Sequence, residues 1–173
     1  YVLYNPHESD ELAREVQEML QRWEQQDPDV LALWKKMNGW ALQGFEETYK
    51  KFELSFDRTY YESEIYDRGK EIILDGVKRG IFQKEPDGSI AIDLTSDGLG
   101  KKALLRADGT SIYITQDIYL AKLKFDEFHP DLSIYVVASE QNHHFKVLFK
   151  VLDFLQFAFA KQCYHFSYGM VNL

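Results

Sequence analysis

The last third of the chain alternates between patterns typical of helices and of strands. A helix is predicted over 116–127, a strand over 134–138, a helix over 143–158 and a strand over 164–168. Two strands that are joined through a helix run parallel, because the crossover returns the chain to the edge from which it started. The pattern therefore predicts an α/β fold with a parallel sheet, in which ligands bind beyond the carboxyl ends of the strands.

Two amphipathic helices are predicted at the beginning of the chain. Apolar residues recur at helical spacing from about residue 9 to residue 25. Asp27 and Pro28 then begin a second helix, with Asp27 as its N-cap and Pro28 as its first residue. We interpret the three tryptophans of these helices as core or partner-facing packing residues rather than ligand contacts: Trp23, Trp34 and Trp40.

The middle of the chain shows strand, helix and turn signals. Residues 52–56 alternate apolar and polar side chains, as a half-buried strand does. Ser63 is expected to cap a helix that ends at Gly80. The dipeptides Asp-Gly at 87–88 and at 108–109 are both typical of tight turns, so we expect a hairpin at each.

Composition limits the kind of protein that this chain can be. Apolar residues make up 45% and aromatic residues 15% of its 173 residues, more than a disordered segment carries. A net charge of −8 argues against a nucleic-acid-binding surface spread over the chain, because phosphate contacts need clustered Lys and Arg. Cys163 is the single cysteine, so an internal disulfide is impossible. With no membrane-spanning run and no signal peptide in the sequence, we expect a cytoplasmic protein.

Tyr113 and Asp117 are the first candidates for a binding site. They lie four residues apart across a predicted strand-to-helix junction. A carboxylate beside an aromatic hydroxyl suits a planar cation, because a guanidinium can form a charge-assisted and bidentate contact with it. The alternative is structural: if Thr115 caps the helix, Asp117 lies in its first turn, where the helix dipole favours a negative charge. The residues alone leave both interpretations open.

The loops after the two predicted parallel strands supply further candidates. The Gln141 amide can orient polar ligand groups, and Gly169 permits close backbone approach or a positive φ, although both are equally ordinary loop residues. His143 and His144 are adjacent on a predicted helix, so their side chains point about 100° apart and make a poor metal pair. His165 has no partner at zinc spacing, and we therefore predict no metal site.

Three segments taken together resemble the arginyl-tRNA synthetases, a family of class I aminoacyl-tRNA synthetases. They are LRADGTSIYITQDI at 105–118, IYVVASEQ at 134–141 and HFSYGMV at 165–171. Members of this family activate arginine with ATP to arginyl-adenylate and then transfer arginine to its tRNA. The family commonly has Thr-Arg-Asp where this chain has Thr-Gln-Asp at 115–117, a departure that leaves Tyr113 and Asp117 intact.

The resemblance implies two ligand sites. By position, Tyr113 and Asp117 contact the arginine guanidinium, and Gln141 belongs to the same arginine site. The resemblance also implies an ATP site, in which backbone meets adenine, formed by His165, Gly169, Met170 and Val171. ATP is then a substrate that is expected to come with Mg²⁺, no cofactor is tightly bound, and the partners are L-arginine, ATP and tRNA(Arg).

The family's two phosphate-stabilising motifs, His-x-Gly-His and Lys-Met-Ser-Lys, do not occur in this sequence, so we assign no catalytic residue. The resemblance therefore implies an internal piece of a catalytic domain, inactive by itself. Its parts are a helical segment over 1–51, a strand-helix unit over 52–80, a hairpin insertion over 81–102 and the second half of a Rossmann-like nucleotide-binding fold over 103–173.

Such a piece has exposed strand edges, which favour its self-association. The alternatives are a non-catalytic module that binds arginine or a nucleotide, and an interaction domain built on the Trp-rich helices.

Overall fold

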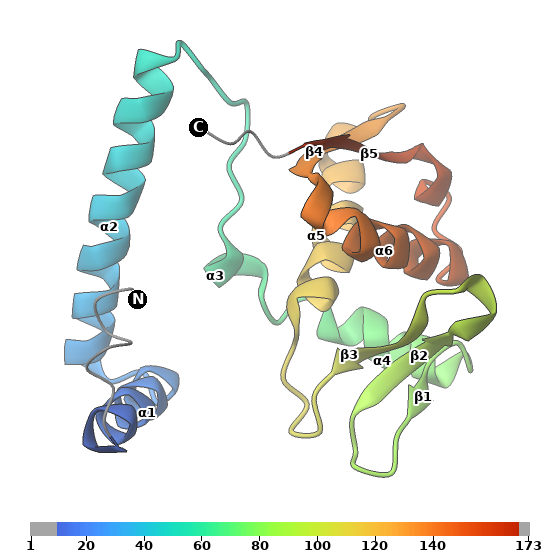
Figure 1. Ribbon diagram of the computed structural model, residues 1–173, viewed down its shortest axis with the longest axis horizontal. Coiled ribbons are helices and arrows are strands. Elements are labelled where there is room, and N and C mark those ends of the chain that lie inside the picture. The colour runs from blue at the N-terminus through green and yellow to red at the C-terminus, as the bar shows by residue number, and fades with distance from the viewer. Residues whose placement is uncertain (1–9, 170–173) are drawn as a thin grey trace. The chain divides into compact units, whose positions relative to one another are not determined.

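The computed structural model describes residues 10–169, and the chain divides into two compact units between Thr59 and Tyr60 (Figure 1). The first unit contains helices α1 (Asp10–Glu24) and α2 (Pro28–Lys51). The second unit contains every other element and all the described candidate site residues. None of the described helices is long and apolar enough to cross a membrane.

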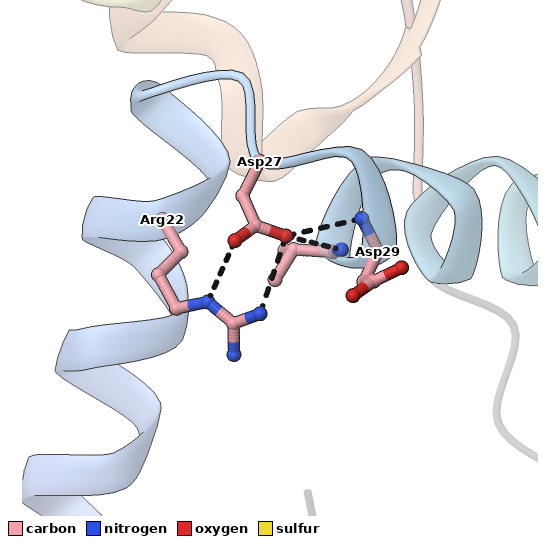
Figure 2. A network of polar contacts seen from close by, with 4 residues as sticks. Arg22, Asp27 and Asp29 are labelled. Atoms are coloured by element: carbon pink, nitrogen blue, oxygen red, sulfur yellow. Dashed lines mark hydrogen bonds and ion pairs between the residues drawn. The ribbon is translucent and has the colours of Figure 1, made fainter.

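Asp27 organises the turn between α1 and α2, as predicted. Its carboxylate accepts hydrogen bonds from the backbone N–H groups of Asp29 and Val30 at 3.0 and 3.1 Å, which makes it the N-cap of α2. The Arg22 guanidinium donates to the same carboxylate through Nε and Nη2 at 3.0 and 3.2 Å (Figure 2). The Arg22 hydrogen bond, followed by that of the Val30 N–H, holds the pKa of Asp27 below its ordinary value.

The tryptophans of the first unit differ in their surroundings. Trp23 and Trp34 pack edge to face, with ring centroids 5.9 Å apart, which confirms a packing role for this pair. Trp40 is 62% exposed, and the Nζ atom of Lys36 lies 5.1 Å from its ring. A groove of about 430 Å³ is lined by side chains of both helices: Val16, Met19, Leu20, Trp23, Val30, Leu33, Trp34 and Met37.

The strand predicted over 52–56 is wrong. Phe52 is the C-cap of α2, Glu53 has a left-handed φ of 55°, and the described chain up to Tyr61 forms neither strand nor helix. The Phe56 ring instead packs edge to face on Tyr49 of α2, at a centroid distance of 4.9 Å. Alternation alone does not make a strand, because a strand needs a neighbour that takes its backbone hydrogen bonds.

The helix predicted over 63–80 is interrupted. It forms α3 (Glu62–Ile65) and α4 (Lys70–Lys78), so the predicted cap at Ser63 is wrong and Tyr61 is the residue before α3. Gly69 separates the two helices and is the N-cap of α4. Gly80, with a φ of 73°, follows the end of α4 as predicted, because glycine adopts the left-handed conformation without strain.

A three-stranded antiparallel sheet follows, in the order β1 (Gln83–Lys84), β2 (Ile90–Leu94) and β3 (Gly100–Leu105). Both Asp-Gly turns are confirmed: Gly88 and Gly109 have left-handed φ values of 92° and 80°. The carboxylates of Asp87 and Asp108 each accept a hydrogen bond from the backbone N–H two residues later. The second turn closes only one bridge, between Leu105 and Ser111, because a helix begins shortly afterwards.

The last third of the described chain has the predicted alternation. Its elements are α5 (Tyr113–Phe128), β4 (Ser133–Ala138), η3 (Ser139–Gln141), α6 (Asn142–Phe154), η4 (Ala160–Gln162) and β5 (Cys163–Tyr168). Strands β4 and β5 pair in parallel, from Ser133 opposite Cys163 to Ala138 opposite Tyr168. Helices α5 and α6 lie side by side near this pair (Figure 1). The predicted α/β class and parallel sheet are therefore confirmed.

The core of the second unit joins the antiparallel sheet to α5 and α6. Apolar side chains with at most 1% exposure come from α4, β2, β3, α5 and α6: Ile73, Leu94, Leu104, Leu105, Ile114, Ile118, Ala121, Val147, Leu148, Val151 and Leu152. The β4–β5 sheet has two unlike faces. Tyr135, Val137 and Cys163 pack against the core, whereas the alternate residues are exposed: Ile134, Val136, Tyr164, Phe166 and Tyr168.

Candidate functional site

Two of the candidate segments leave the sheet at the same edge. Strand β4 ends at Ala138 and β5 at Tyr168, and these two residues are partners in the parallel register. Gln141 ends η3, is the N-cap of α6 and is exposed. Gly169 is also exposed, and a β-carbon placed there would meet no described atom within 4 Å. The carboxyl edge of the sheet therefore presents Gln141 and Gly169 to solvent, as expected for a parallel α/β sheet.

Met170 and Val171 lie outside the described residues.

Tyr113 and Asp117 both belong to α5. Tyr113 is the first residue of the helix rather than part of a strand, and it is 74% exposed. Asp117 lies one turn later, so the two side chains project from the same side of the helix.

Thr115 is not the cap of α5, which contradicts the structural explanation of Asp117. Ile112 precedes the helix, and no side chain caps it. Thr115 is fully buried, and its hydroxyl donates to the carbonyl oxygen of Leu104 at the end of β3. Asp117 is the fifth residue of α5, beyond the first turn in which the helix dipole stabilises a carboxylate. The position of Asp117 thus needs another reason.

The structure pairs Asp117 with His144. The Nε2 atom of His144 on α6 lies 2.7 Å from Oδ2 of Asp117 on α5. Their side chains are 23% and 37% exposed, so the pair sits at the surface and keeps access to solvent. A carboxylate accepts, and His144 therefore donates through Nε2–H. Sequence reasoning considered His144 only as a metal ligand and missed this contact, because 27 residues separate the partners.

His165 is held on the inner side of the sheet. Its Nε2 atom lies 2.9 Å from the carbonyl oxygen of Val137 on β4, and its ring stacks on Phe145 with centroids 4.3 Å apart. The carbonyl oxygen accepts, so Nε2 is the donor and Nδ1 is the nitrogen left for another partner. The His165 side chain is partly buried.

Lys124 of α5, Tyr135 of β4 and Cys163 of β5 are three partly buried titratable residues that influence one another. The Nζ atom of Lys124 on α5 lies 3.8 Å from the ring centroid of Tyr135. Burial lowers the pKa of Lys124, and electrostatic interactions with Cys163 and Asp117 oppose that change. Burial raises the pKa of Tyr135 and of the Cys163 thiol. The largest cause of all three pKa changes is the partial burial of these side chains.

Metal ligands do not gather in the described part of the chain. Residues 10–169 contain no group of three or more His, Cys, Asp or Glu side chains that could hold a metal ion. The candidate site consists of the Asp117 carboxylate with His144, the phenol of Tyr113, and the loops beyond β4 and β5.

In α/β folds, ligands that include nucleotides bind beyond the carboxyl ends of parallel strands, and Gln141 and Gly169 lie at that edge of this unit. The family model for the catalytic domain of class I tRNA synthetases (R) matches residues 4–172. This chain belongs to that family, which confirms the resemblance seen in the sequence.

Relatives agree with this assignment. The arginine–tRNA ligase of Bacteroides thetaiotaomicron is 53% identical over 162 residues, which cover 94% of this chain and 27% of the relative. The arginine–tRNA ligase of Treponema pallidum is 49% identical over 176 residues, covering 100% of this chain and 30% of the relative. The chain thus spans about 27–30% of the length of these relatives.

Solved structures show the same fold at much lower identity. The crystal structure of arginyl-tRNA synthetase from Plasmodium falciparum superimposes with a TM-score of 0.75 at 19% identity. The match covers 94% of this chain and 29% of that structure.

Proposed function

We propose that this chain is the part of an arginine–tRNA ligase that binds L-arginine and contributes to the ATP site. The whole enzyme activates arginine with ATP to arginyl-adenylate, then transfers arginine to tRNA(Arg). The observation that carries this proposal is the Asp117 carboxylate, which α5 presents at a partly exposed position although no helix cap or dipole accounts for it. Tyr113, one turn earlier on the same helix, adds an exposed phenol.

The arginine site comprises Tyr113, Asp117 and Gln141. The guanidinium is planar, permanently charged and rich in donors, so a carboxylate that keeps free lone pairs is its best partner. Asp117 has Oδ1 and one lone pair of Oδ2 available when His144 occupies the other. The Gln141 side chain, at the start of α6, can orient the polar groups at the other end of the amino acid.

The ATP site comprises His165, Gly169, Met170 and Val171. Gly169 is exposed, and a β-carbon placed there would meet no described atom within 4 Å, which suits the approach of a planar base to its backbone. ATP is a substrate here and brings Mg²⁺ on its phosphates.

The domain boundaries form part of the same proposal. The helical segment is 1–51, the connecting unit 52–80, the hairpin insertion 81–102 and the second half of the nucleotide-binding fold 103–173.

We place the protein in the cytoplasm. The isolated chain self-associates through the exposed apolar face of β4 and β5, because parallel sheets are stable when both faces are covered. Light scattering of the purified chain measures its oligomeric state, and a monomer at high concentration would contradict self-association.

Arginine-dependent exchange of pyrophosphate into ATP tests the function. The complete polypeptide that carries this segment should catalyse exchange with arginine and not with lysine or other amino acids, and should charge tRNA(Arg). Pyrophosphate exchange that does not depend on arginine would contradict the proposed function.

The same exchange assay on the isolated 173-residue chain is the second part of the test. It should show no exchange, since neither phosphate-stabilising motif of the family is in its sequence. Calorimetric titration with arginine alone distinguishes the rival function. Micromolar binding without any exchange by the complete polypeptide would identify an arginine-sensing module instead.

A further inference from the structure

We propose that His144 is the positioning residue of the arginine site, and that it acts by holding the Asp117 carboxylate in the orientation that receives the guanidinium. The inference rests on the proposed function and deepens it, since it adds to the site a residue that no sequence pattern had marked. The structural basis is the 2.7 Å contact between His144 Nε2 and Asp117 Oδ2.

Asp117 needs such a partner because of where it lies. A partly exposed aspartate on a helix is free to rotate about two side-chain bonds, and each rotamer aims the carboxylate differently. A guanidinium has to meet both the charge and the plane of the carboxylate, so a fixed orientation saves the entropy of ordering it at the moment of binding. The hydrogen bond from His144 occupies one lone pair of Oδ2 and leaves the remaining lone pairs for the ligand.

His144 is itself held by the core. It lies in the first turn of α6, where its ring packs edge to face on Phe145 with centroids 5.6 Å apart. Phe145 is buried and stacks on His165 at 4.3 Å, and the next turn of α6 buries Val147 and Leu148 completely. The buried residues of α6 therefore hold the helix in place, and with it the His144 ring that contacts Asp117 on the neighbouring helix.

His144 also links two parts of the proposed arginine site. Gln141 is the N-cap of α6 and precedes His144 by three residues. Asp117 comes from α5, and the imidazole bridges from one element to the other. Around metal sites, a hydrogen bond between a histidine and a carboxylate fixes the orientation of the histidine ring. The same kind of contact here fixes the orientation of the Asp117 carboxylate.

The neighbouring His143 offers a matched control. It is exposed, and its side chain points about 100° away from that of His144 around the helix. A substitution at 143 changes the same residue type in the same turn of the same helix without touching Asp117.

Three variants of the complete polypeptide test the inference by arginine-dependent pyrophosphate exchange. His144→Phe keeps an aromatic ring and removes the donor, and should raise the KM for arginine by on the order of 10- to 100-fold, as expected for the loss of a hydrogen bond to a charged group. The KM for ATP should change less than about twofold. His144→Gln restores a donor and should recover most of the loss, whereas His143→Phe should match the wild type.

Failure of this inference and failure of the proposed function give different results. If Asp117→Asn raises the arginine KM and His144→Phe does not, His144 has no positioning role while the arginine site stands. If neither variant changes the KM for arginine, the assignment of the arginine site is wrong. Equal rises in the KM values for arginine and ATP in His144→Phe would indicate a general structural defect and would overturn the positioning role.

A direct readout remains if His144→Phe does not fold. Imidazole nitrogen chemical shifts of the 173-residue chain report the hydrogen bond without any ligand. Asp117→Asn should shift the Nε2 resonance of His144 and leave that of His143 in place. An unchanged His144 resonance would show that the two side chains are not bonded, which overturns the inference.

Discussion

Gly69 and Thr115 approach so closely that a β-carbon on Gly69 would lie 2.1 Å from the carbonyl oxygen of Thr115 and 2.9 Å from its Cγ2 atom. Gly69 is the N-cap of α4 and Thr115 lies in the first turn of α5, so this contact sets how near the two helices come. Position 69 has an ordinary negative φ of −71°. Glycine is therefore required there by space and not by backbone conformation.

Gly69→Ala should destabilise the second unit by about 1–3 kcal/mol, because the added methyl group forces α4 away from α5. Urea unfolding measures the change. Gly39→Ala on α2 is the matched control: a β-carbon there meets no described atom within 4 Å, and the exchange should stabilise the helix by about 0.5–1 kcal/mol. Equal effects of both substitutions would contradict the close approach at position 69.

Thr115→Val should destabilise the second unit by about 1–3 kcal/mol, although the side chain keeps its size. The buried Thr115 hydroxyl donates to the Leu104 carbonyl oxygen, and valine leaves that acceptor without its partner. Thr48→Val provides the comparison on α2, where an exposed hydroxyl donates to the carbonyl oxygen of Gly44. A loss at 115 no larger than at 48, measured by thermal unfolding, would mean that the buried hydrogen bond adds no stability.

Asp117→Asn in the complete polypeptide should weaken arginine binding by on the order of 2–5 kcal/mol, because the guanidinium of the bound arginine loses its negatively charged partner. The KM for arginine in pyrophosphate exchange is the measurement. Asp126→Asn, on the same helix, removes a 56% exposed carboxylate that pairs with Lys122 and should change little. An arginine dependence that is the same in both variants would exclude Asp117 from the site.

Acid should weaken the α1–α2 turn through Asp27. The folded state holds the pKa of this carboxyl below the ordinary value of 3.8, chiefly through the Arg22 hydrogen bond. A lowered folded pKa means that the contribution to stability is present above pH 3.8 and is lost as the pH falls from there through the folded pKa. Circular dichroism should show a loss of helix in this range. Asp27→Ala should already have less helix at neutral pH and a smaller acid-dependent change.

Local signals were sufficient wherever a feature depends on residues close together in the chain. The Asp27 cap, the turn glycines Gly88 and Gly109 and the alternation from α5 to β5 were all predicted, because each depends on side-chain chemistry within a few residues. The family could also be recognised, since short segments of characteristic sequence carry it. The proposed ligand roles of Tyr113, Asp117 and Gln141 come from the same source and stay predictions.

Contacts between distant elements could not be read in the same way. Residues 52–56 have the alternation of a strand but no strand beside them in the described chain, and Thr115 looks like a cap until Leu104 appears beside its hydroxyl. Only the packing of α5 on α6 brings His144 to Asp117. The chain by itself therefore determined the Asp27 cap, the two Asp-Gly turns and the family, because these depend on residues close together in the sequence. The tertiary structure decided which buried and polar groups meet, because those groups lie on elements that are far apart in the sequence.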